Sequence, residues 1–211
     1  MRVLTVAAQK GGAGKTTLAA SLAVAAAQDG EAVVAIDLDP QRSLTEWGER
    51  RQAGDIAFRP VDVAGLADLL ARIQAHGRAT LCLIDTPGAF DETVITALRH
   101  SDLCLLPVRP SILDVNATRR TAEALRVLGR RFAFVLSQVQ ATSAARAEDA
   151  AEALVAIGPL FPGFIGLRAD HLDAMLMGQG VSEWRSRGPA AAEIRDLWDW
   201  LKNKLNEEQG A

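Results

Sequence analysis

The sequence predicts an α/β fold, a mostly parallel and twisted sheet of about seven or eight strands with helices on both of its faces. Short apolar runs alternate along the chain with longer Ala- and Leu-rich stretches, in which apolar residues recur with helical period. The length of 211 residues suits one such domain, and no linker or shift in composition divides residues 1–211. With 49% hydrophobic and 23% charged residues, the composition excludes a disordered chain.

The expected elements follow one another as strand, helix and strand, the order that makes neighbouring strands parallel. The strands are expected at residues 3–8, 32–37, 57–61, 81–85, 103–107 and 132–137, with a shorter one at 164–166. The helices are expected at residues 15–29, 43–51, 64–76, 91–100, 114–128, 144–157 and 190–206. In such a sheet ligands bind beyond the carboxyl ends of the strands, so motifs that follow strands are the candidates for function.

A glycine-rich segment joins the first expected strand to the first expected helix. It reads Gln9-Lys10-Gly11-Gly12-Ala13-Gly14-Lys15-Thr16-Thr17. In such a loop the glycines let backbone N–H groups cradle phosphate oxygens, and the helix N-terminus adds its positive dipole end. Lys15 is placed to reach the β- and γ-phosphates, and the Thr16 hydroxyl to hold Mg²⁺. We therefore expect residues 10–17 to bind a nucleotide.

This loop departs from the usual pattern G-x-x-x-x-G-K-[ST] in two ways. Gln9 stands where the first glycine is expected, and an additional lysine, Lys10, precedes the glycines. The arrangement resembles the deviant Walker A motif of the ParA/MinD ATPases, a class of P-loop NTPases. The resemblance implies that the nucleotide is ATP, and that Lys10 reaches across a dimer interface to the nucleotide of a partner subunit. Lys10 and Lys15 are therefore expected to act in catalysis as well as in binding.

The second expected strand runs into two acidic residues, Asp37 and Asp39. Side chains two residues apart point to the same side of an extended chain, so both carboxylates can face the nucleotide crevice. With Pro40 and Gln41 they form a D-x-D-P-Q motif that resembles the next motif of the same family. The resemblance implies that Asp39 positions or polarises the attacking water and that Asp37 supports the Mg²⁺ site, through water. A turn at Asp39-Pro40 with a helix cap at Ser43 is the alternative, and both can hold.

The fourth expected strand ends in Asp85 and is followed by Pro87 and Gly88, which is typical of a Walker B acid and its switch. Asp85 is expected to hold Mg²⁺ through water, because Mg²⁺ keeps several of its waters. The Gly88 N–H is placed to sense the γ-phosphate. Residues 107–114, and residues 166–168 with the later Gly178, also resemble segments of the family. Ser137-Gln138 stands where the family often has an Asn that touches the base, so the sequence assigns no adenine contact.

The motifs form no pocket for a second small substrate, and no Cys/His set suits an iron–sulfur cluster. A switch is therefore the favoured function. By resemblance to the short ParA ATPases, the chain is expected to form a homodimer on binding ATP and Mg²⁺ and to bind DNA nonspecifically as that dimer. Hydrolysis, slow by itself, is expected to be stimulated by a ParB-like or other cargo adaptor. The cargo would be a plasmid, a chromosome or a protein complex.

A local excess of arginine lies between residues 99 and 146, where eight arginines stand against three acids although the whole chain has a net charge of -3. Such an excess can bind phosphates without reading base sequence. The candidates for DNA contact are Arg119 and Arg120, and, by analogy with C-terminal arginines of the family, Arg168, Arg185 and Arg187. The alternative is a solvated helix face on which Glu123 pairs with Arg119 and Arg126.

A MinD-like ATPase that binds a membrane surface is the main alternative function, and the last expected helix tests it. One face of this helix carries Ile194, Leu197, Trp198, Leu201 and Leu205. A membrane-targeting helix has a polar face rich in Lys and Arg. Here basic residues are mixed with Asp196, Asp199, Glu207 and Glu208, which favours packing in the core. A metabolic phosphoryl-transfer enzyme of the dethiobiotin-synthetase type is a further alternative, in which Lys10 would lack a role.

Three features of the sequence bear on where the protein acts. No apolar segment approaches the length of a membrane span, and the N-terminal apolar stretch runs into glycines instead of a cleavage site. Cys82 and Cys104 lie in apolar runs, as buried core thiols do. We expect a cytoplasmic protein without a membrane partner, associated with the nucleoid when ATP is bound. The absence of a long N-terminal extension indicates the short ParA type.

Overall fold

Within the described residues, 1–207, the sheet has seven strands in the order β3-β2-β4-β1-β5-β6-β7, and every neighbouring pair is parallel. Their bounds in this computed structural model are β1 (Arg2–Val6), β2 (Val33–Asp37), β3 (Ile56–Pro60), β4 (Leu81–Asp85), β5 (Leu103–Val108), β6 (Phe132–Val139) and β7 (Leu160–Gly166). The expected fold class is confirmed. Glu208, counted above with the acids near the last helix, lies outside the described residues.

Helices connect the strands in the expected positions. They are α1 (Lys15–Gln28), α2 (Ser43–Arg50), a short 3-10 helix (Val63–Gly65), α3 (Leu66–His76), α4 (Glu92–Arg99), α5 (Ile112–Val127), α6 (Ala144–Val155), α7 (Ala169–Leu176), α8 (Val181–Trp184) and α9 (Pro189–Asn206). No helix was expected in the stretch that forms α7 and α8. These helices have only 8 and 4 residues, which is too short for a helical period to stand out.

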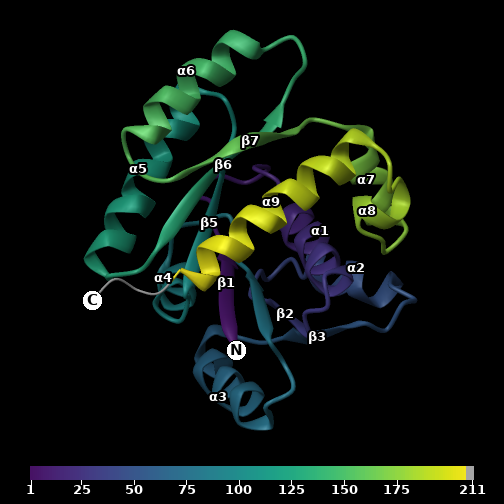
Figure 1. The fold of residues 1–211 in the computed structure, drawn as a ribbon. Helices are drawn as coiled ribbons and strands as arrows, with labels where there is room; N and C mark the ends of the chain where they lie inside the picture. The colour runs from purple at the N-terminus through teal and green to yellow at the C-terminus, as the bar shows by residue number, and fades with distance from the viewer. Residues whose placement is uncertain (208–211) are drawn as a thin grey trace.

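Strand side chains alternate between apolar cores on the two faces of the sheet. On one face Leu83 of β4 packs into the cluster that includes α1 and α9, and on the other face Ile84 packs into the cluster that includes α3. A further cluster joins Leu106 and Phe134 to α4, α5 and α6. Figure 1 shows α9 crossing the front of the sheet beside α1. Both faces of the sheet are thus covered, which explains why its strands read as continuous apolar runs.

The apolar face of α9 belongs to the core, as expected. Its buried residues include Ile194, Leu197, Trp198, Leu201 and Leu205. The Trp198 Nε1 donates a hydrogen bond of 2.9 Å to Asp29, the residue that follows α1. In the part of the chain that the structure describes, no helix is both long and apolar enough to cross a membrane.

Both cysteines are core residues. Cys82 and Cys104 are free thiols with no exposed surface. Burial raises the pKa of both thiols to about 12, so they stay protonated and unreactive at neutral pH. The expectation of buried structural thiols is confirmed.

Candidate functional site

The glycine-rich loop lies between β1 and α1, at the carboxyl edge of the sheet. Gly14 is the residue before α1, and its φ of 86° is in the left-handed region that only glycine enters without strain. Gly12 has a φ of 75° for the same turn. The Leu18 N–H donates to the Gly14 carbonyl at 2.9 Å, so the helix begins directly after the loop. The geometry is that of a phosphate-binding loop leading into a helix N-terminus.

The segment after β4 closes one side of this loop. A Cβ atom built on Gly88 would lie 3.4 Å from the Gly11 nitrogen and 3.7 Å from the Lys15 Nζ. Lys15 is 7% exposed and has no ion-pair partner within residues 1–207. A buried ammonium without a counterion needs one, and a phosphate can supply it. Gly88 therefore lies where it can respond to a group held between Gly11 and Lys15.

Thr16 and Asp85 form the pair that suits a divalent cation. The Thr16 hydroxyl donates a hydrogen bond of 2.6 Å to Asp85 Oδ2. The other carboxylate oxygen, Oδ1, is buried without a hydrogen-bond partner. Burial, aided by the charge of Asp37, raises the pKa of Asp85 to about 7, and a cation would stabilise its ionised form. Within residues 1–207 no three His, Cys, Asp or Glu side chains gather as metal ligands, so a Mg²⁺ ion here would need phosphate oxygens and waters as its further ligands.

Asp37 lies beside Asp85 at the carboxyl edge of the sheet. The two residues are direct partners in the parallel pairing of β2 and β4. Asp37 is 4% exposed, and both of its oxygens already accept hydrogen bonds, Oδ1 from the Asp39 N–H and Oδ2 from the Thr45 N–H and hydroxyl. Asp37 thus braces the turn that carries Asp39 and caps the first turn of α2. Ser43 makes no side-chain cap, so the alternative that assigned the cap to Ser43 is wrong.

Asp39, unlike Asp37, is only partly buried. Its Oδ1 accepts a hydrogen bond of 2.9 Å from the Gln41 N–H, and its carbonyl accepts one from the Arg42 N–H at 2.8 Å. These bonds form the turn expected from the D-x-D-P-Q motif. The carboxylate keeps its second oxygen without a hydrogen bond from any residue in the described range 1–207. Asp39 can therefore still accept a proton or a hydrogen bond from a water molecule.

The end of β6 supports the phosphate loop, a role that the sequence did not reveal. The Ser137 hydroxyl donates to the Ala13 carbonyl at 2.9 Å, and Gln138 Nε2 donates to the Gly12 carbonyl at 2.5 Å. Gln138 adopts a φ of 55°, which is uncommon for a residue with a side chain and recurs at functional sites. Ser137 and Gln138 thus hold the loop in shape at the position where the family often has a base-contacting Asn.

A pocket of about 360 Å³ opens beside the loop. Gly14, Thr17 and Gln138 line one side, and residues 165–169, His171 and Leu172 line the other. His171 is 7% exposed, and neither ring nitrogen has a hydrogen-bond partner within residues 1–207. Burial lowers its pKa, which keeps the imidazole neutral. The pocket is next to the phosphate loop and mostly apolar, as a nucleoside site should be.

Lys10 lies on the other side of the loop. It lines a shallow hollow together with Pro107, Asp114 and Thr118, and it is half-buried. No ion pair of Lys10 occurs in the described residues. Its ammonium is therefore free to meet a charge brought by another molecule.

The five expected DNA-contacting arginines fall into two groups. Arg168 is tied to Glu193 and Arg185 to Asp170 by ion pairs. The exposed residues Arg119, Arg120 and Arg187 form no ion pair within residues 1–207. The pairs of Glu123 with Arg119 and Arg126, expected on a solvated face, are absent from the same range.

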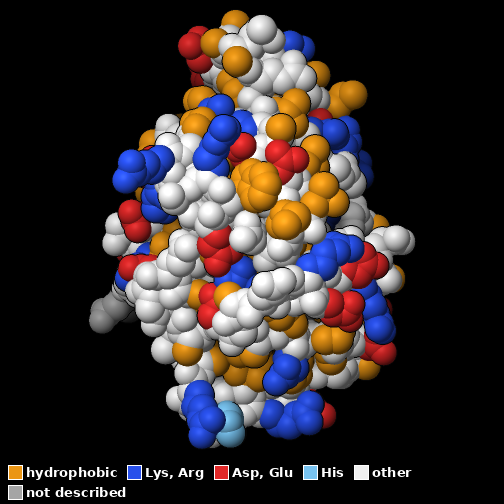
Figure 2. Space-filling model, turned by 90° about the vertical axis from the view of Figure 1, so that its right-hand side faces the viewer, with side chains coloured by type: hydrophobic (Ala, Val, Ile, Leu, Met, Phe, Trp, Pro, Cys, Tyr) orange, Lys and Arg blue, Asp and Glu red, His pale blue; other side chains and the backbone are white. Residues whose placement is uncertain are grey.

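The side of the molecule that bears α7 and α8 is partly apolar. Figure 2 looks onto this side and shows hydrophobic side chains gathered among basic and acidic ones. The exposed apolar side chains of this region are Leu167, Leu172, Leu176, Met177 and Trp184. Leu167 and Leu172 also line the pocket beside the phosphate loop, so the apolar surface reaches the site.

A phosphate loop with a preceding lysine, two acids on adjacent parallel strands and a glycine that approaches the loop define a nucleotide-binding protein with a deviant Walker A loop. The model of the CobQ/CobB/MinD/ParA nucleotide binding domain matches residues 4–181. The chain belongs to this family, as the sequence motifs indicated.

Individual relatives agree with this assignment. The Maintenance of carboxysome distribution protein A of Gloeobacter kilaueensis is 34% identical over 197 residues, which are 91% of this chain and 89% of the relative. The MinC:MinD cell division protein complex of Aquifex aeolicus has a TM-score of 0.84 at 20% identity, over 96% of both chains. A Cyanothece McdA variant in complex with ATP has a TM-score of 0.78 at 22% identity, over 100% of this chain and 98% of the other. The two structures confirm the fold.

Proposed function

We propose that the chain is an ATP-driven switch of the ParA type, which pairs with a second copy when ATP and Mg²⁺ are bound and separates after hydrolysis. The observation that carries the proposal is the different setting of two lysines in one loop. Lys15 is buried behind the loop, where it can neutralise the nucleotide of its own chain. Lys10 is half-buried and without an ion pair in the described residues, so it can serve a second copy. ATP would then be part of the contact between the two.

Each residue of the site has a task in hydrolysis under this proposal. Lys15 binds the β- and γ-phosphates, and Thr16 and Asp85 hold Mg²⁺, which would neutralise charge on those phosphates. Asp39 accepts a hydrogen bond from the attacking water and orients it toward the γ-phosphate. Asp37 keeps Asp39 in place through the bond from the Asp39 N–H. The base lies in the pocket of about 360 Å³ beside Gly14 and Thr17.

The ATP dimer is proposed to bind DNA without sequence preference and to carry a plasmid, chromosome or protein complex. Arg119 and Arg120 support this step, because they are adjacent, exposed on α5 and without an ion pair among residues 1–207. Arg187 can add to the surface, whereas Arg168 and Arg185 must first give up their acidic partners. A ParB-like or other adaptor would stimulate hydrolysis and release the dimer from the nucleoid.

Sedimentation with DNA tests the proposal. The wild-type protein should co-sediment with DNA of any sequence in the presence of a nonhydrolysable ATP analogue and Mg²⁺, and lose this binding at high salt. The double variant R119A/R120A should bind at least about tenfold more weakly. The double variant R72A/R78A is the matched control. It removes two positive charges from α3 and the turn that follows it, and it should bind DNA as the wild type does.

Two further measurements separate the proposal from its alternatives. K15A should fail to bind ATP, because the γ-phosphate loses its main cation, and normal ATP affinity of this variant would overturn the site. Co-sedimentation with anionic lipid vesicles instead of DNA would favour a MinD-like role. The burial of the apolar face of α9 argues against that outcome. ATP turnover that requires a small acceptor molecule would favour a metabolic enzyme.

A further inference from the structure

The segment after β5 brings an arginine to the phosphate loop. β5 is the neighbour of β1 on the side opposite β4, so its carboxyl end lies next to the loop that follows β1. A Cβ atom built on Gly12 would lie 4.0 Å from Nη1 of Arg109. The loop is therefore flanked by Gly88 on the β4 side and by Arg109 on the β5 side.

A buried carboxylate holds this arginine. Asp114, 9% exposed, accepts hydrogen bonds from Nε and Nη2 of Arg109 at 3.1 and 2.9 Å, both on its Oδ1. Its Oδ2 accepts a bond from the Ser111 hydroxyl at 2.8 Å. Because Asp114 and Ser111 form the first turn of α5, the carboxylate is fixed to a rigid element. This arrangement fixes the plane of the guanidinium and hence the direction of its third nitrogen.

The third nitrogen, Nη1, is left for another acceptor. Within residues 1–207 it forms no hydrogen bond, while Nε and Nη2 are both engaged. Arg109 also lines an open hollow of about 250 Å³ with Gln138, Ser143 and Arg146, so a ligand can reach it. An arginine that is anchored at two nitrogens and presents the remaining one beside a phosphate loop is suited to bind an oxyanion.

We propose that Arg109 binds a phosphate oxygen of the nucleoside triphosphate and is a third cation of the site beside Lys10 and Lys15. The inference rests on the proposed function, since it assumes that the loop binds ATP. The phosphate belongs either to the nucleotide of the same chain or to the one held by a second copy facing it. Asp114 is the positioning residue that fixes Arg109, and it does not itself contact the nucleotide.

The test compares R109Q and R109K with the wild type. R109Q removes the positive charge. R109K keeps a cation that can pair with Asp114, but it has no second nitrogen that could bind a phosphate oxygen beside Gly12. R146Q is the control, because it removes the same charge from the same hollow at a residue whose Nη2 is bound to Ser143. Affinity for ADP and for a nonhydrolysable ATP analogue is measured by fluorescence titration, and the mass of the ATP complex by light scattering.

If Arg109 contacts the nucleotide of its own chain, R109Q and R109K bind the ATP analogue about tenfold more weakly, and ADP affinity falls as well only if the contacted oxygen belongs to the α- or β-phosphate. If Arg109 contacts the nucleotide of the second copy, R109Q and R109K should lose the ATP-dependent dimer. Their ATP affinity should then equal that of K10A when all are compared in the K10A background, where no dimer contributes to binding. R146Q should match the wild type in both measurements. Wild-type ATP affinity together with wild-type dimer formation in R109K would overturn the inference. A wild-type protein that binds no ATP would overturn the proposed function instead.

Discussion

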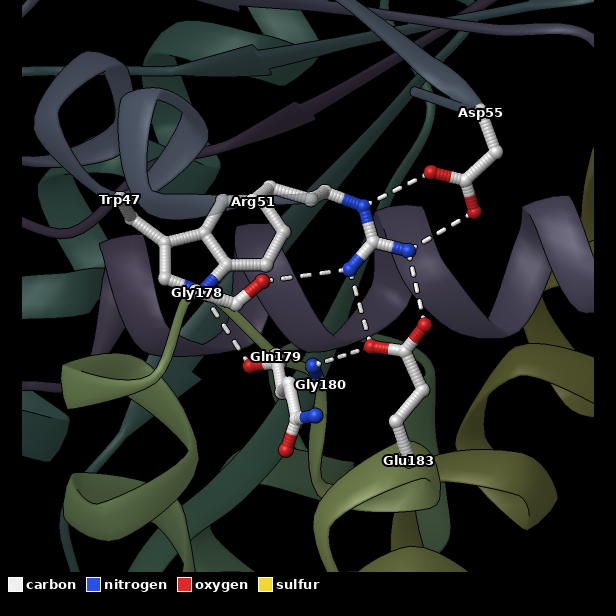
Figure 3. A network of polar contacts seen from close by, with 7 residues as sticks. All are labelled: Trp47, Arg51, Asp55, Gly178, Gln179, Gly180 and Glu183. Atoms are coloured by element: carbon white, nitrogen blue, oxygen red, sulfur yellow. Dashed lines mark hydrogen bonds and ion pairs between the residues drawn. The ribbon is translucent and has the colours of Figure 1, made fainter. Parts of the chain in front are cut away.

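Arg51 and Glu183 form a two-bond ion pair that joins the end of α2 to α8, 132 residues further along the chain (Figure 3). The Arg51 side chain is 3% exposed, and it also pairs with Asp55 and lies over the Trp47 ring. Nearby, the Trp47 Nε1 donates to the Gln179 carbonyl, and Glu183 accepts a bond from the Gly180 N–H. The helix that follows the Asp39 turn is thereby fastened to the loop between α7 and α8.

Removing the Arg51 side chain should destabilise the protein. R51M leaves two carboxylates without their cation and breaks the link between α2 and α8, which should lower the free energy of unfolding by about 3 kcal/mol. Urea unfolding checks this value. R50M is the matched control, because within residues 1–207 Arg50 makes only a surface pair of 3.5 Å with Glu46, and its loss should cost less than about 0.5 kcal/mol. Equal losses in both variants would contradict the structural role of the Arg51 pair.

The contribution of His171 to the stability of the nucleotide-free protein should be lost as the medium becomes acidic, whereas Asp85, whose pKa burial raises to about 7, acts in the opposite direction. Burial lowers the folded-state pKa of His171, with Glu193, Arg168 and Asp170 as the neighbouring charges. The unfolded state then takes up a proton first, so this contribution is lost as the pH falls below about 6.5. Urea unfolding at pH 7.5 and 5.5 should show that acidification costs H171F less free energy of unfolding than it costs the wild type, because Asp85 is present in both. H76Q, at an exposed histidine, should keep the wild-type difference, and an unchanged difference in H171F would exclude His171 as the cause.

K10A should separate nucleotide binding from dimer formation. Lys15 and the loop remain intact, so ATP affinity should stay within a few-fold of the wild type. The charge offered to the second copy is lost, so light scattering should find a monomer with ATP and Mg²⁺ present. An ATP-dependent dimer of K10A would show that another group connects the two copies.

D39A should bind ATP and dimerise but hydrolyse ATP slowly. Loss of the group that orients the attacking water should lower turnover by about a hundredfold or more, and the ATP dimer should persist. Phosphate release and native mass measurement check both points. D68A, at an exposed acid on α3, should turn over as the wild type does. Rapid hydrolysis by D39A would remove Asp39 from the mechanism.

Much of the site was predictable because its residues are neighbours along the chain. The phosphate loop, the D-x-D-P-Q turn and Asp85 each follow a strand directly, and parallel strands bring their carboxyl ends to one edge. This rule placed Asp37, Asp39 and Asp85 at one edge of the sheet, whereas the direct pairing of Asp37 with Asp85 follows from the position of β2 next to β4, which the sequence did not determine. The capping of α2 by Asp37 rather than Ser43 was not predictable, because it depends on where the side chains of the turn point.

Local pattern was sufficient for the class of fold, the phosphate loop and the burial of α9, because each is encoded in adjacent residues or in a repeated spacing. Contacts between segments far apart in the chain could not be predicted from adjacent residues or from their spacing. Gln138 reaches Gly12 across 126 residues, and Arg109 approaches the same glycine, only because β1 lies between β4 and β5 with β6 next in the sheet. Strand order is a property of the folded chain, since it follows from how the helices pack on both faces and leaves no mark on the spacing of residues.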